Sequence, residues 1–299
     1  MLSSYAMSLS KIRRWMLHLV LVATGAALLI AGVAVCLFPD WLDDVRSPFR
    51  CPLGDVERQL LARTLQAVTS ALDAANVTYF MMSGTLLGSY RHHDRIPWDD
   101  DVDLIVPMSE QARVKAAVRP LEPEFRLISD AATGYQWKFF VSAPTAGSHR
   151  AWFSYRSWSI RWPFIDVFFY ERNATHLWNT CPWFPDEVWP LRAIFPLRRR
   201  PFGHLSLPAP CDTATTLAVN FDTTRCRSRD YDHVRNHHNL LWLRTAVEVD
   251  CSSLETMWPF VRRRRWTDRQ FGIRHVTETL WAPGGQYTLS EITLVDQCL

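Results

Sequence analysis

The longest uninterrupted apolar pattern lies near the N-terminus, where residues 15–38 contain no Lys, Arg, Asp or Glu. About 20 such residues are enough to cross a bilayer as a helix. Basic side chains precede the run and acidic ones follow it, namely Lys11, Arg13 and Arg14, then Asp40, Asp43 and Asp44. Because positive flanks stay in the cytosol, we expect residues 1–14 to be a cytosolic tail and residues 15–38 a single-pass type II transmembrane anchor. The alternative is a cleaved signal peptide, whose apolar stretch is shorter, about 7 to 15 residues, and ends at a small-residue site.

Beyond the apolar run, composition predicts a short connector and then one folded domain. Residues 39–53 are rich in proline and charge, which is typical of a stem, so we place the domain at residues 54–299. With 299 residues that are 48% hydrophobic, the chain can bury a substantial core. A net charge of only +3 disfavours a disordered or nucleic-acid-coating protein, and we expect no nucleic-acid partner.

Helical and strand periodicities alternate in the first part of this domain. Residues 56–75 place leucines and valines at helical spacing, which predicts an amphipathic helix. Residues 77–82 and 102–106 are short, β-prone and apolar, which predicts two buried strands. Between them, residues 83–85 form an expected tight turn and residues 86–91 a short helix. The mixture predicts an α+β fold, with a mixed sheet flanked by helices.

Candidate chemistry is concentrated just before the second of these strands. Asp99, Asp101 and Asp103 alternate along the chain, so an extended backbone would project them to one side. Crowded carboxylates at the end of a buried strand need a cation, and hard oxygen ligands suit Mg²⁺ or Mn²⁺. The competing interpretation is a solvated acidic turn.

Two later β-prone runs each carry one charged residue among apolar neighbours. Asp166 lies in the run 162–169, where burial would be costly without a metal ion or a charged partner. It is our candidate for a third metal ligand. Lys138, in the run 135–140, is a candidate phosphate contact or else a snorkelling surface lysine.

Residues 83–92, which read SGTLLGSYRH, and residues 96–104, which read IPWDDDVDL, together resemble the signature of the LicD/fukutin family. The run 162–169 resembles that family's second motif. The resemblance implies a nucleotidyltransferase-like fold with Gly84 and Thr85 at a phosphate-binding turn. It also implies metal ligation by Asp101 and Asp103, completed by the later acid Asp166. Arg91 is a further candidate for contact with the nucleotide or the acceptor.

For activity, the resemblance implies metal-dependent transfer of a phospho-alcohol or phospho-sugar group, of the phosphocholine or ribitol-phosphate type. The donor would be nucleotide-activated, and a CDP-alcohol is expected. The acceptor would be a hydroxyl on a glycan or glycoconjugate. Two alternatives stay open: a nucleotidyltransferase that attacks the phosphorus next to the nucleoside, and a non-catalytic glycan-binding protein that uses its tryptophans for stacking.

Cysteines and sequons agree with a domain in the Golgi or endoplasmic reticulum lumen. Outside the apolar run there are six cysteines, which would permit three disulfides in 15 pairings. They are Cys51, Cys181, Cys211, Cys226, Cys251 and Cys298. Asn76 and Asn173 each begin an Asn-x-Thr tripeptide and are candidate glycosylation sites.

Overall fold

The computed structural model describes residues 9–37, 47–129, 135–142, 153–155, 158–229, 231–233, 237–238, 246–296 and 298. The chain divides into two compact units, Met1–Pro48 and Phe49–Leu299. The second unit holds the extensive hydrophobic core and the candidate chemistry, so the fold is described mainly for that unit.

The part of the N-terminal unit that the structure describes includes helix α1 (Leu9–Leu37). Its segment Arg13–Ile30 is long and apolar enough to cross a membrane, and none of that segment is buried within the protein. This confirms the expected apolar helix. Length and composition by themselves do not distinguish an anchor from a signal sequence.

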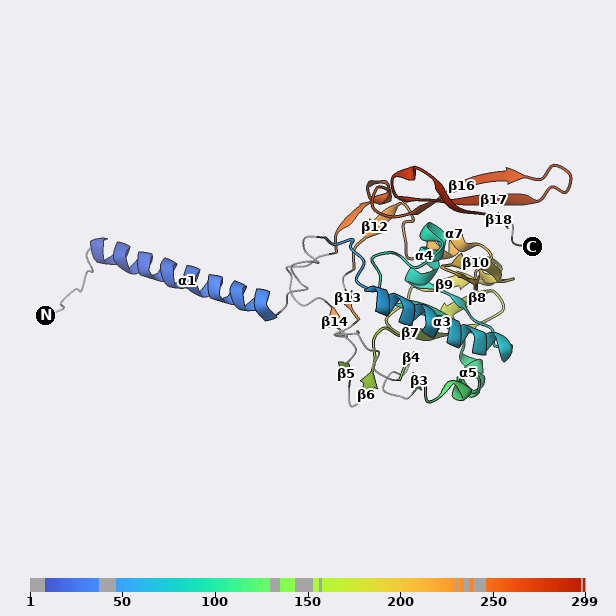
Figure 1. Cartoon of the computed structure of the whole chain (residues 1–299), viewed down its shortest axis with the longest axis horizontal. Coiled ribbons are helices and arrows are strands. Elements are labelled where there is room, and N and C mark those ends of the chain that lie inside the picture. The colour runs from blue at the N-terminus through green and yellow to red at the C-terminus, as the bar shows by residue number, and fades with distance from the viewer. Residues whose placement is uncertain are drawn as a thin grey trace. The chain divides into compact units, whose positions relative to one another are not determined.

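A seven-stranded mixed sheet forms the centre of the second unit (Figure 1). Five strands follow the order β1-β2-β7-β4-β3, and β8 and β9 extend the sheet from β7. Their bounds are β1 (Phe80–Met81), β2 (Val102–Pro107), β3 (Phe125–Ile128), β4 (Gln136–Val141), β7 (Ile165–Arg172), β8 (His176–Asn179) and β9 (Val188–Pro190). β2 and β7 are parallel, whereas the other pairs are antiparallel, so the expected mixed sheet is confirmed.

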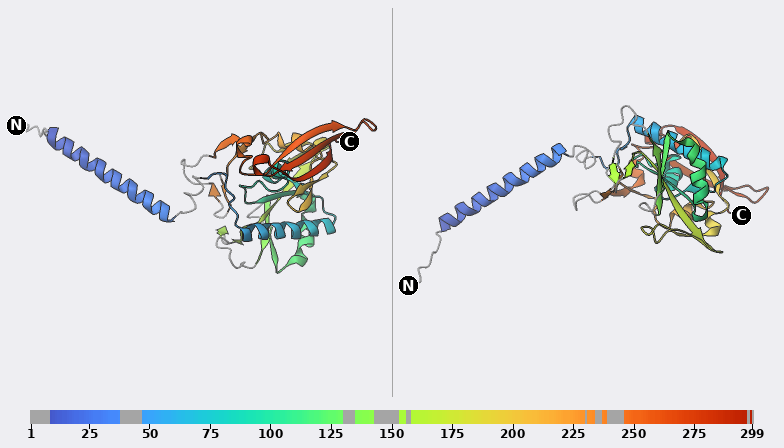
Figure 2. Two further views of the ribbon diagram at one scale, coloured as in Figure 1. Left: turned by 45° about the horizontal axis from the view of Figure 1, so that its top comes forward. Right: turned by 90° about the horizontal axis from the view of Figure 1, so that it is seen from below.

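The amphipathic helix is also confirmed, as α3 (Asp55–Ala74), and it covers one face of the sheet beside α5 (Gln111–Val118) (Figure 2). Leu61, Leu65, Val68 and Leu72 are its buried apolar positions, and their spacing of three and four residues explains the helix. The core extends N-terminal to the expected boundary at residue 54, because Phe49 and Leu53 are buried in the same cluster.

The glycine-containing segment differs from expectation. Instead of a turn followed by a helix, α4 (Ser83–His92) begins at Ser83 itself. Ser83 has a φ of +45°, and Leu86 donates its backbone N–H to Met82 O at 2.9 Å. The reversal is therefore made at one residue, and Gly84 and Thr85 lie in the first helical turn.

Smaller elements surround this sheet. The short helices are η1 (Met108–Glu110), η2 (Arg119–Leu121), α6 (Leu191–Ile194), α7 (Thr213–Leu217), η3 (Cys251–Leu254) and η4 (Pro283–Gly285). The two-stranded pairs are β5 (Phe153–Tyr155) with β6 (Trp158–Ile160), β10 (Arg198–Phe202) with β11 (Leu205–Ala209), β12 (Arg225–Arg227) with β15 (Glu248–Asp250), and β13 (Tyr231–Asp232) with β14 (His237–His238). A three-stranded antiparallel sheet contains β16 (Phe260–Thr267), β17 (Arg274–Trp281) and β18 (Thr288–Val295).

Two disulfides form instead of the three that six cysteines would permit. Cys211 pairs with Cys298 and Cys226 with Cys251, whereas Cys51 and Cys181 are free thiols. Cys51 packs against the main core cluster, and Cys181 belongs to a second cluster built around Phe80 and Ile105. The two remaining thiols therefore lie in different clusters, which explains why they do not form a third bridge.

Candidate active site

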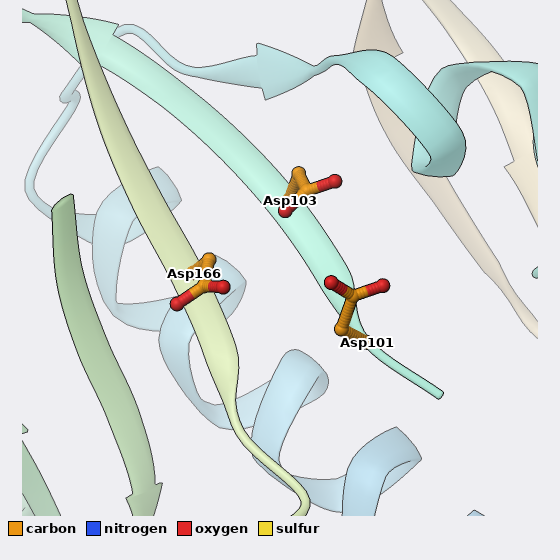
Figure 3. Close-up of side chains that lie close together, drawn as sticks. All are labelled: Asp101, Asp103 and Asp166. Carbon is orange, nitrogen blue, oxygen red and sulfur yellow. The ribbon is translucent and has the colours of Figure 1, made fainter. Parts of the chain in front are cut away.

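Three of the predicted acids come together where β2 and β7 begin (Figure 3). Asp103 lies directly opposite Asp166 in the parallel register, and Asp101 immediately precedes β2. One carboxylate oxygen from each of the three lies within 4.8 Å of the others. The cluster is poorly exposed, because Asp166 is buried and the other two are half-buried.

Each outer carboxylate of this cluster already contacts a cationic side chain. Lys138 on β4 donates from Nζ to Asp166 Oδ1 at 2.7 Å, and both side chains are buried. His233 Nε2 lies 2.9 Å from Asp101 Oδ2. Lys138 is therefore not a snorkelling surface residue, and its ammonium group is held beside the acidic cluster.

Asp100 has a different role from its neighbours, because it is fully buried behind them. Arg229 Nη1 donates to Asp100 Oδ2 at 2.8 Å, and His233 Nδ1 lies 2.7 Å from Asp100 Oδ1. Both oxygens of Asp100 thus have a cationic partner. His233 bridges Asp100 and Asp101 through its two ring nitrogens, which fixes the ring orientation.

The surroundings lower the pKa of Asp101 and raise the pKa values of Asp99, Asp103 and Asp166. Burial would raise the pKa of Asp101, but His233 and Lys138 lower it to about 2. By contrast, burial together with the neighbouring carboxylates raises the pKa of Asp103 well above its ordinary value. Burial also raises the pKa of Asp166, against the opposing effect of Lys138. The pKa of Asp99 rises to about 8 through burial and repulsion from Asp101 and Asp100.

His233 completes this charge arrangement. Burial would lower the pKa of its ring, but Asp101 and Asp100 raise it well above the ordinary value, so the ring is cationic at neutral pH. Even with His233 and Lys138 charged, the carboxylates of Asp103 and Asp166 face each other across neighbouring strands. A divalent cation would relieve that repulsion.

The acids open into a cavity of 430 Å³. Asp99, Asp101, Asp103 and His233 line it, together with the first helical turn of α4 at Gly84. A methyl group at Gly84 would approach Asp99 Oδ2 to 3.0 Å, which is tighter than ordinary contact. The absence of a side chain at residue 84 therefore keeps room between the helix and the acids.

Thr85, the second residue of the expected phosphate turn, ties α4 to β2. Its Oγ1 accepts a hydrogen bond from the backbone N–H of Asp103 at 2.7 Å, and the side chain is buried. The contact positions Asp103 relative to the start of α4. Backbone N–H groups in the first turn of a helix are the ones that bind anions, so the location agrees with the predicted phosphate site.

Arg91 lines the same cavity, but its guanidinium group is largely committed to the protein. It donates to the backbone carbonyls of Asp222, Thr223 and Arg225 at 2.6–3.2 Å. Burial lowers the pKa of Arg91 to about 10. These contacts indicate that Arg91 holds the segment 222–225 against α4. Contact with a ligand stays a prediction.

Arg229 and His233 were not among the predicted site residues, because they lie beyond the motifs that resemble the LicD/fukutin family. No spacing or periodicity in residues 225–238 indicates that these two side chains meet Asp100. They are recognised only when the chain folds back onto the first acidic motif, more than 120 residues earlier.

The two candidate glycosylation residues are both exposed. Asn76 lies in the loop between α3 and β1, and Asn173 lies between β7 and β8. Asn173 Oδ1 accepts hydrogen bonds from the backbone N–H groups of Thr175 and His176. Exposure is compatible with glycosylation at either residue, which remains a prediction.

The three acids suit a hard divalent cation. Carboxylate oxygens are the ligands that Mg²⁺ and Mn²⁺ prefer, and an octahedral Mg²⁺ site spans about 4 Å between opposite ligands. The 4.8 Å limit on the oxygens of Asp101, Asp103 and Asp166 is close to that span. The fold and the site thus define an α+β domain with a carboxylate cluster at one end of two parallel strands.

Comparison with known proteins places this domain. Residues 76–212 match the family described as LicD/FKTN/FKRP, nucleotidyltransferase domain. This range of the chain contains the glycine motif and all three acids of the cluster. This match confirms the resemblance to the LicD/fukutin family that the motifs in residues 83–104 indicated.

Individual relatives match over shorter or more divergent stretches. A 44-residue segment, 15% of this chain, is 52% identical to the Ribitol 5-phosphate transferase FKRP of Mus musculus and of Homo sapiens. A segment covering 56% of this chain is 25% identical to the Ribitol-5-phosphate transferase FKTN of Mus musculus. The matched segments span 9% of the FKRP proteins and 34% of FKTN. An uncharacterized protein of Rickettsia typhi, RT0683, is 22% identical over 48% of this chain and 39% of its own length.

Proposed function

We propose that this protein is a metal-dependent phosphotransferase that moves a phospho-alcohol group from a nucleotide diphosphate donor to a hydroxyl group. The expected donor is a CDP-alcohol of the ribitol or choline type, and the expected acceptor is a glycan or glycoconjugate. The observation that carries the proposal is the meeting of Asp101, Asp103 and Asp166 in one cluster, whose members Asp101 and Asp103 line a cavity together with Gly84. The family match and the names of the relatives agree with it.

In this proposal Asp101, Asp103 and Asp166 hold Mg²⁺ or Mn²⁺. When bound, that ion neutralises phosphate charge and polarises the phosphorus–oxygen bonds. The first turn of α4, at Gly84 and Thr85, offers backbone N–H groups to phosphate oxygens.

Lys138 and Asp99 have separate roles in the proposal. Lys138 keeps the Asp166 carboxylate in one orientation through its 2.7 Å contact. Asp99 lines the same cavity as Asp101 and Asp103, so its carboxylate is placed to exchange a proton with the attacking hydroxyl.

A nucleotidyltransferase is the second candidate, because the matched family is described by that domain name. It would use the same carboxylates but would attack the phosphorus next to the nucleoside. The two reactions differ in their products: phosphotransfer from a CDP-alcohol releases cytidine monophosphate, whereas nucleotidyl transfer leaves the nucleoside monophosphate on the acceptor.

The test is product analysis with the full chain purified in detergent. CDP-ribitol, CDP-choline, CDP-glycerol and CDP-ethanolamine would each be supplied with Mn²⁺ and a mixed glycan acceptor. We expect cytidine monophosphate release from one donor, lost on chelation and reduced at least 1,000-fold in Asp103→Asn and Asp166→Asn. Glu291→Gln, on the exposed strand β18, is the matched control and should retain activity.

Two other outcomes would change the assignment. Transfer of the nucleoside monophosphate to the acceptor would replace phosphotransfer with nucleotidyl transfer. Glycan binding that is unchanged in both Asp→Asn variants, with no turnover of any donor, would favour the non-catalytic glycan-binding alternative.

We further propose that α1 anchors the protein in the Golgi or endoplasmic reticulum membrane with residues 39–299 in the lumen. The helix length and the basic residues before it support this orientation. Protease protection of the C-terminal part in sealed microsomes, together with a mass decrease on deglycosylation that Asn173→Gln diminishes, would support the topology. Cleavage by external protease would refute it.

A further inference from the structure

A second and larger cavity, of 810 Å³, lies among β10, β16, β17, β18, α6 and α7. It is distinct from the carboxylate cavity, and α4 contributes to both. Gly84, Leu87 and Arg91 are three and four residues apart, so they share the face of α4 that lines the carboxylate cavity. Tyr90, on a different face of the helix, lines the larger cavity.

The lining of this second cavity is strongly basic. Among the residues that the structure describes, seven arginines and no lysines line it, against three carboxylates. Asp73, which lies outside the lining, pairs with Arg199 at 3.1 Å, so the excess is three positive charges even when that pair is counted as neutral. The described lining of the carboxylate cavity has no such excess, with five carboxylates against four arginines and the cationic His233.

The carboxylates of the basic cavity already have partners. Asp296 Oδ2 accepts from Arg265 at 2.9 Å, and Asp212 accepts from the backbone N–H and the hydroxyl of Thr215. Glu278 is fully buried beneath the cavity and is shared by two arginines and His93. Glu278 and Asp296 are therefore already paired with arginines, and both oxygens of Asp212 accept hydrogen bonds from Thr215.

Arg200 and Arg263 are held in fixed positions on that wall. Arg200 Nη2 donates to both oxygens of Glu278, at 2.7 and 3.0 Å, and Arg263 Nε donates to Glu278 Oε1 at 2.8 Å. The Arg263 guanidinium also lies 3.4 Å from the centre of the Tyr90 ring and donates to the Tyr90 carbonyl. Two guanidinium groups thus share one carboxylate, and Arg200 Nε has no hydrogen-bond partner although it is buried.

From this arrangement we propose that the basic cavity is a binding site for a phosphate-bearing ligand, separate from the carboxylate cluster. Guanidinium groups match the geometry of phosphate oxygens, and pre-positioned arginines lose little entropy when they bind. An anion would also compensate the charges of buried Arg200 and half-buried Arg263, which have only the one buried carboxylate of Glu278 between them. The site needs no metal ion, so this inference does not rest on the proposed transferase activity.

Strand alternation supplies a matched pair of variants. Along β16, Arg263 and Arg265 line the cavity, whereas Arg264 does not and faces the other side of the strand. Arg265 and Arg274 are exposed, so replacing them should not disturb the buried Arg200–Glu278–Arg263 cluster. Arg265→Gln/Arg274→Gln is therefore the test variant, and Arg264→Gln, which removes one charge from β16 outside the cavity, is the control.

The experiment titrates the full chain in detergent with inorganic pyrophosphate or glucose 6-phosphate, in 150 mM KCl with EDTA, and follows binding by calorimetry. At this salt concentration weak, diffuse attraction is screened. We expect saturable binding that is at least tenfold weaker in Arg265→Gln/Arg274→Gln and unchanged in Arg264→Gln. Arg200→Gln should abolish binding, and its thermal unfolding would show whether it folds.

The two probes identify the source of the phosphate. Binding of pyrophosphate alone indicates a diphosphate ligand, and binding of glucose 6-phosphate indicates a phosphorylated sugar; both support the site if the variants respond as expected. Absence of saturable binding by either probe to the wild-type chain, or equal affinity in the test and control variants, would overturn the proposal. Because EDTA removes divalent ions and no turnover is measured, failure here leaves the transferase proposal untouched.

Discussion

Asp103 and Asp166 lie directly opposite each other on the parallel strands β2 and β7, although 62 positions separate them in the chain. Parallel register brings their carboxylates to the same side of the sheet, where Asp101 joins them. Close like charges destabilise each other unless a cation lies between them. This relationship leads to the first prediction.

Mn²⁺ should stabilise the wild-type protein but not Asp103→Asn. At a concentration one hundred times the dissociation constant, binding contributes about 3 kcal/mol to the free energy of unfolding. In the absence of metal the variant should be at least as stable as wild type, because it lacks one of the mutually repelling carboxylates. Thermal unfolding with and without Mn²⁺ measures both effects. An equal Mn²⁺-induced shift in the variant would refute metal ligation by Asp103.

Lys138 should oppose metal binding while it supports turnover. Its ammonium group lies 2.7 Å from Asp166 Oδ1 and would repel a divalent ion bound by the same carboxylate. We expect Lys138→Met to bind Mn²⁺ about tenfold more tightly, yet to turn over at least tenfold more slowly. Calorimetry and donor turnover test the two halves separately. Weaker Mn²⁺ binding in the variant would mean that the contact mainly orients Asp166.

The contacts of Asp100 with Arg229 and His233 should be important for stability. Asp100 is completely buried, and each of its oxygens has one cationic partner. Arg229→Gln or His233→Gln would leave a buried charge poorly compensated, so each should lower the free energy of unfolding by about 2–3 kcal/mol. Urea denaturation measures the loss, with His176→Gln at the exposed start of β8 as control.

A double variant separates this effect from simple side-chain loss. In the Asp100→Asn background the charge is absent, so adding His233→Gln should cost much less than it does in wild type. Additive losses would show that His233 does not act through Asp100.

Glu278 should make the protein sensitive to acid. Burial would raise the pKa of Glu278, but contacts with His93, Arg200 and Arg263 lower it from 4.5 to about 2. Because the folded-state pKa lies below the unfolded value, this stabilisation is present above about pH 4.5 and is lost as the pH falls towards 2. The pKa difference corresponds to about 3 kcal/mol.

Urea denaturation between pH 7 and pH 2 tests this prediction. Glu278→Gln should be less stable than wild type at pH 7, and the difference should shrink below pH 4. A constant difference across that range would show that ionisation of Glu278 contributes little to folding.

The sequence alone was sufficient to predict helices and strands that depend on the pattern of neighbouring residues. Helix α3 follows from apolar positions three and four residues apart, and β2 from a short apolar run that ends at Pro107. The glycine and aspartate motifs indicated the family and predicted Asp101 and Asp103 as metal ligands. The apolar run 162–169 added Asp166 as the third candidate. The turn expected at residues 83–85 was wrong in form, because the conformation of Ser83 lets the helix start at once.

Contacts between distant segments required the tertiary structure. The pairing of β4 with β7 decides that Lys138 meets Asp166, and the return of Arg229 and His233 to the first motif decides that both meet Asp100. The same holds for the disulfides, whose partners are set by which cysteines are brought within bonding distance. Periodicity records which face of an element is buried, whereas the partner across that face depends on how the whole chain packs.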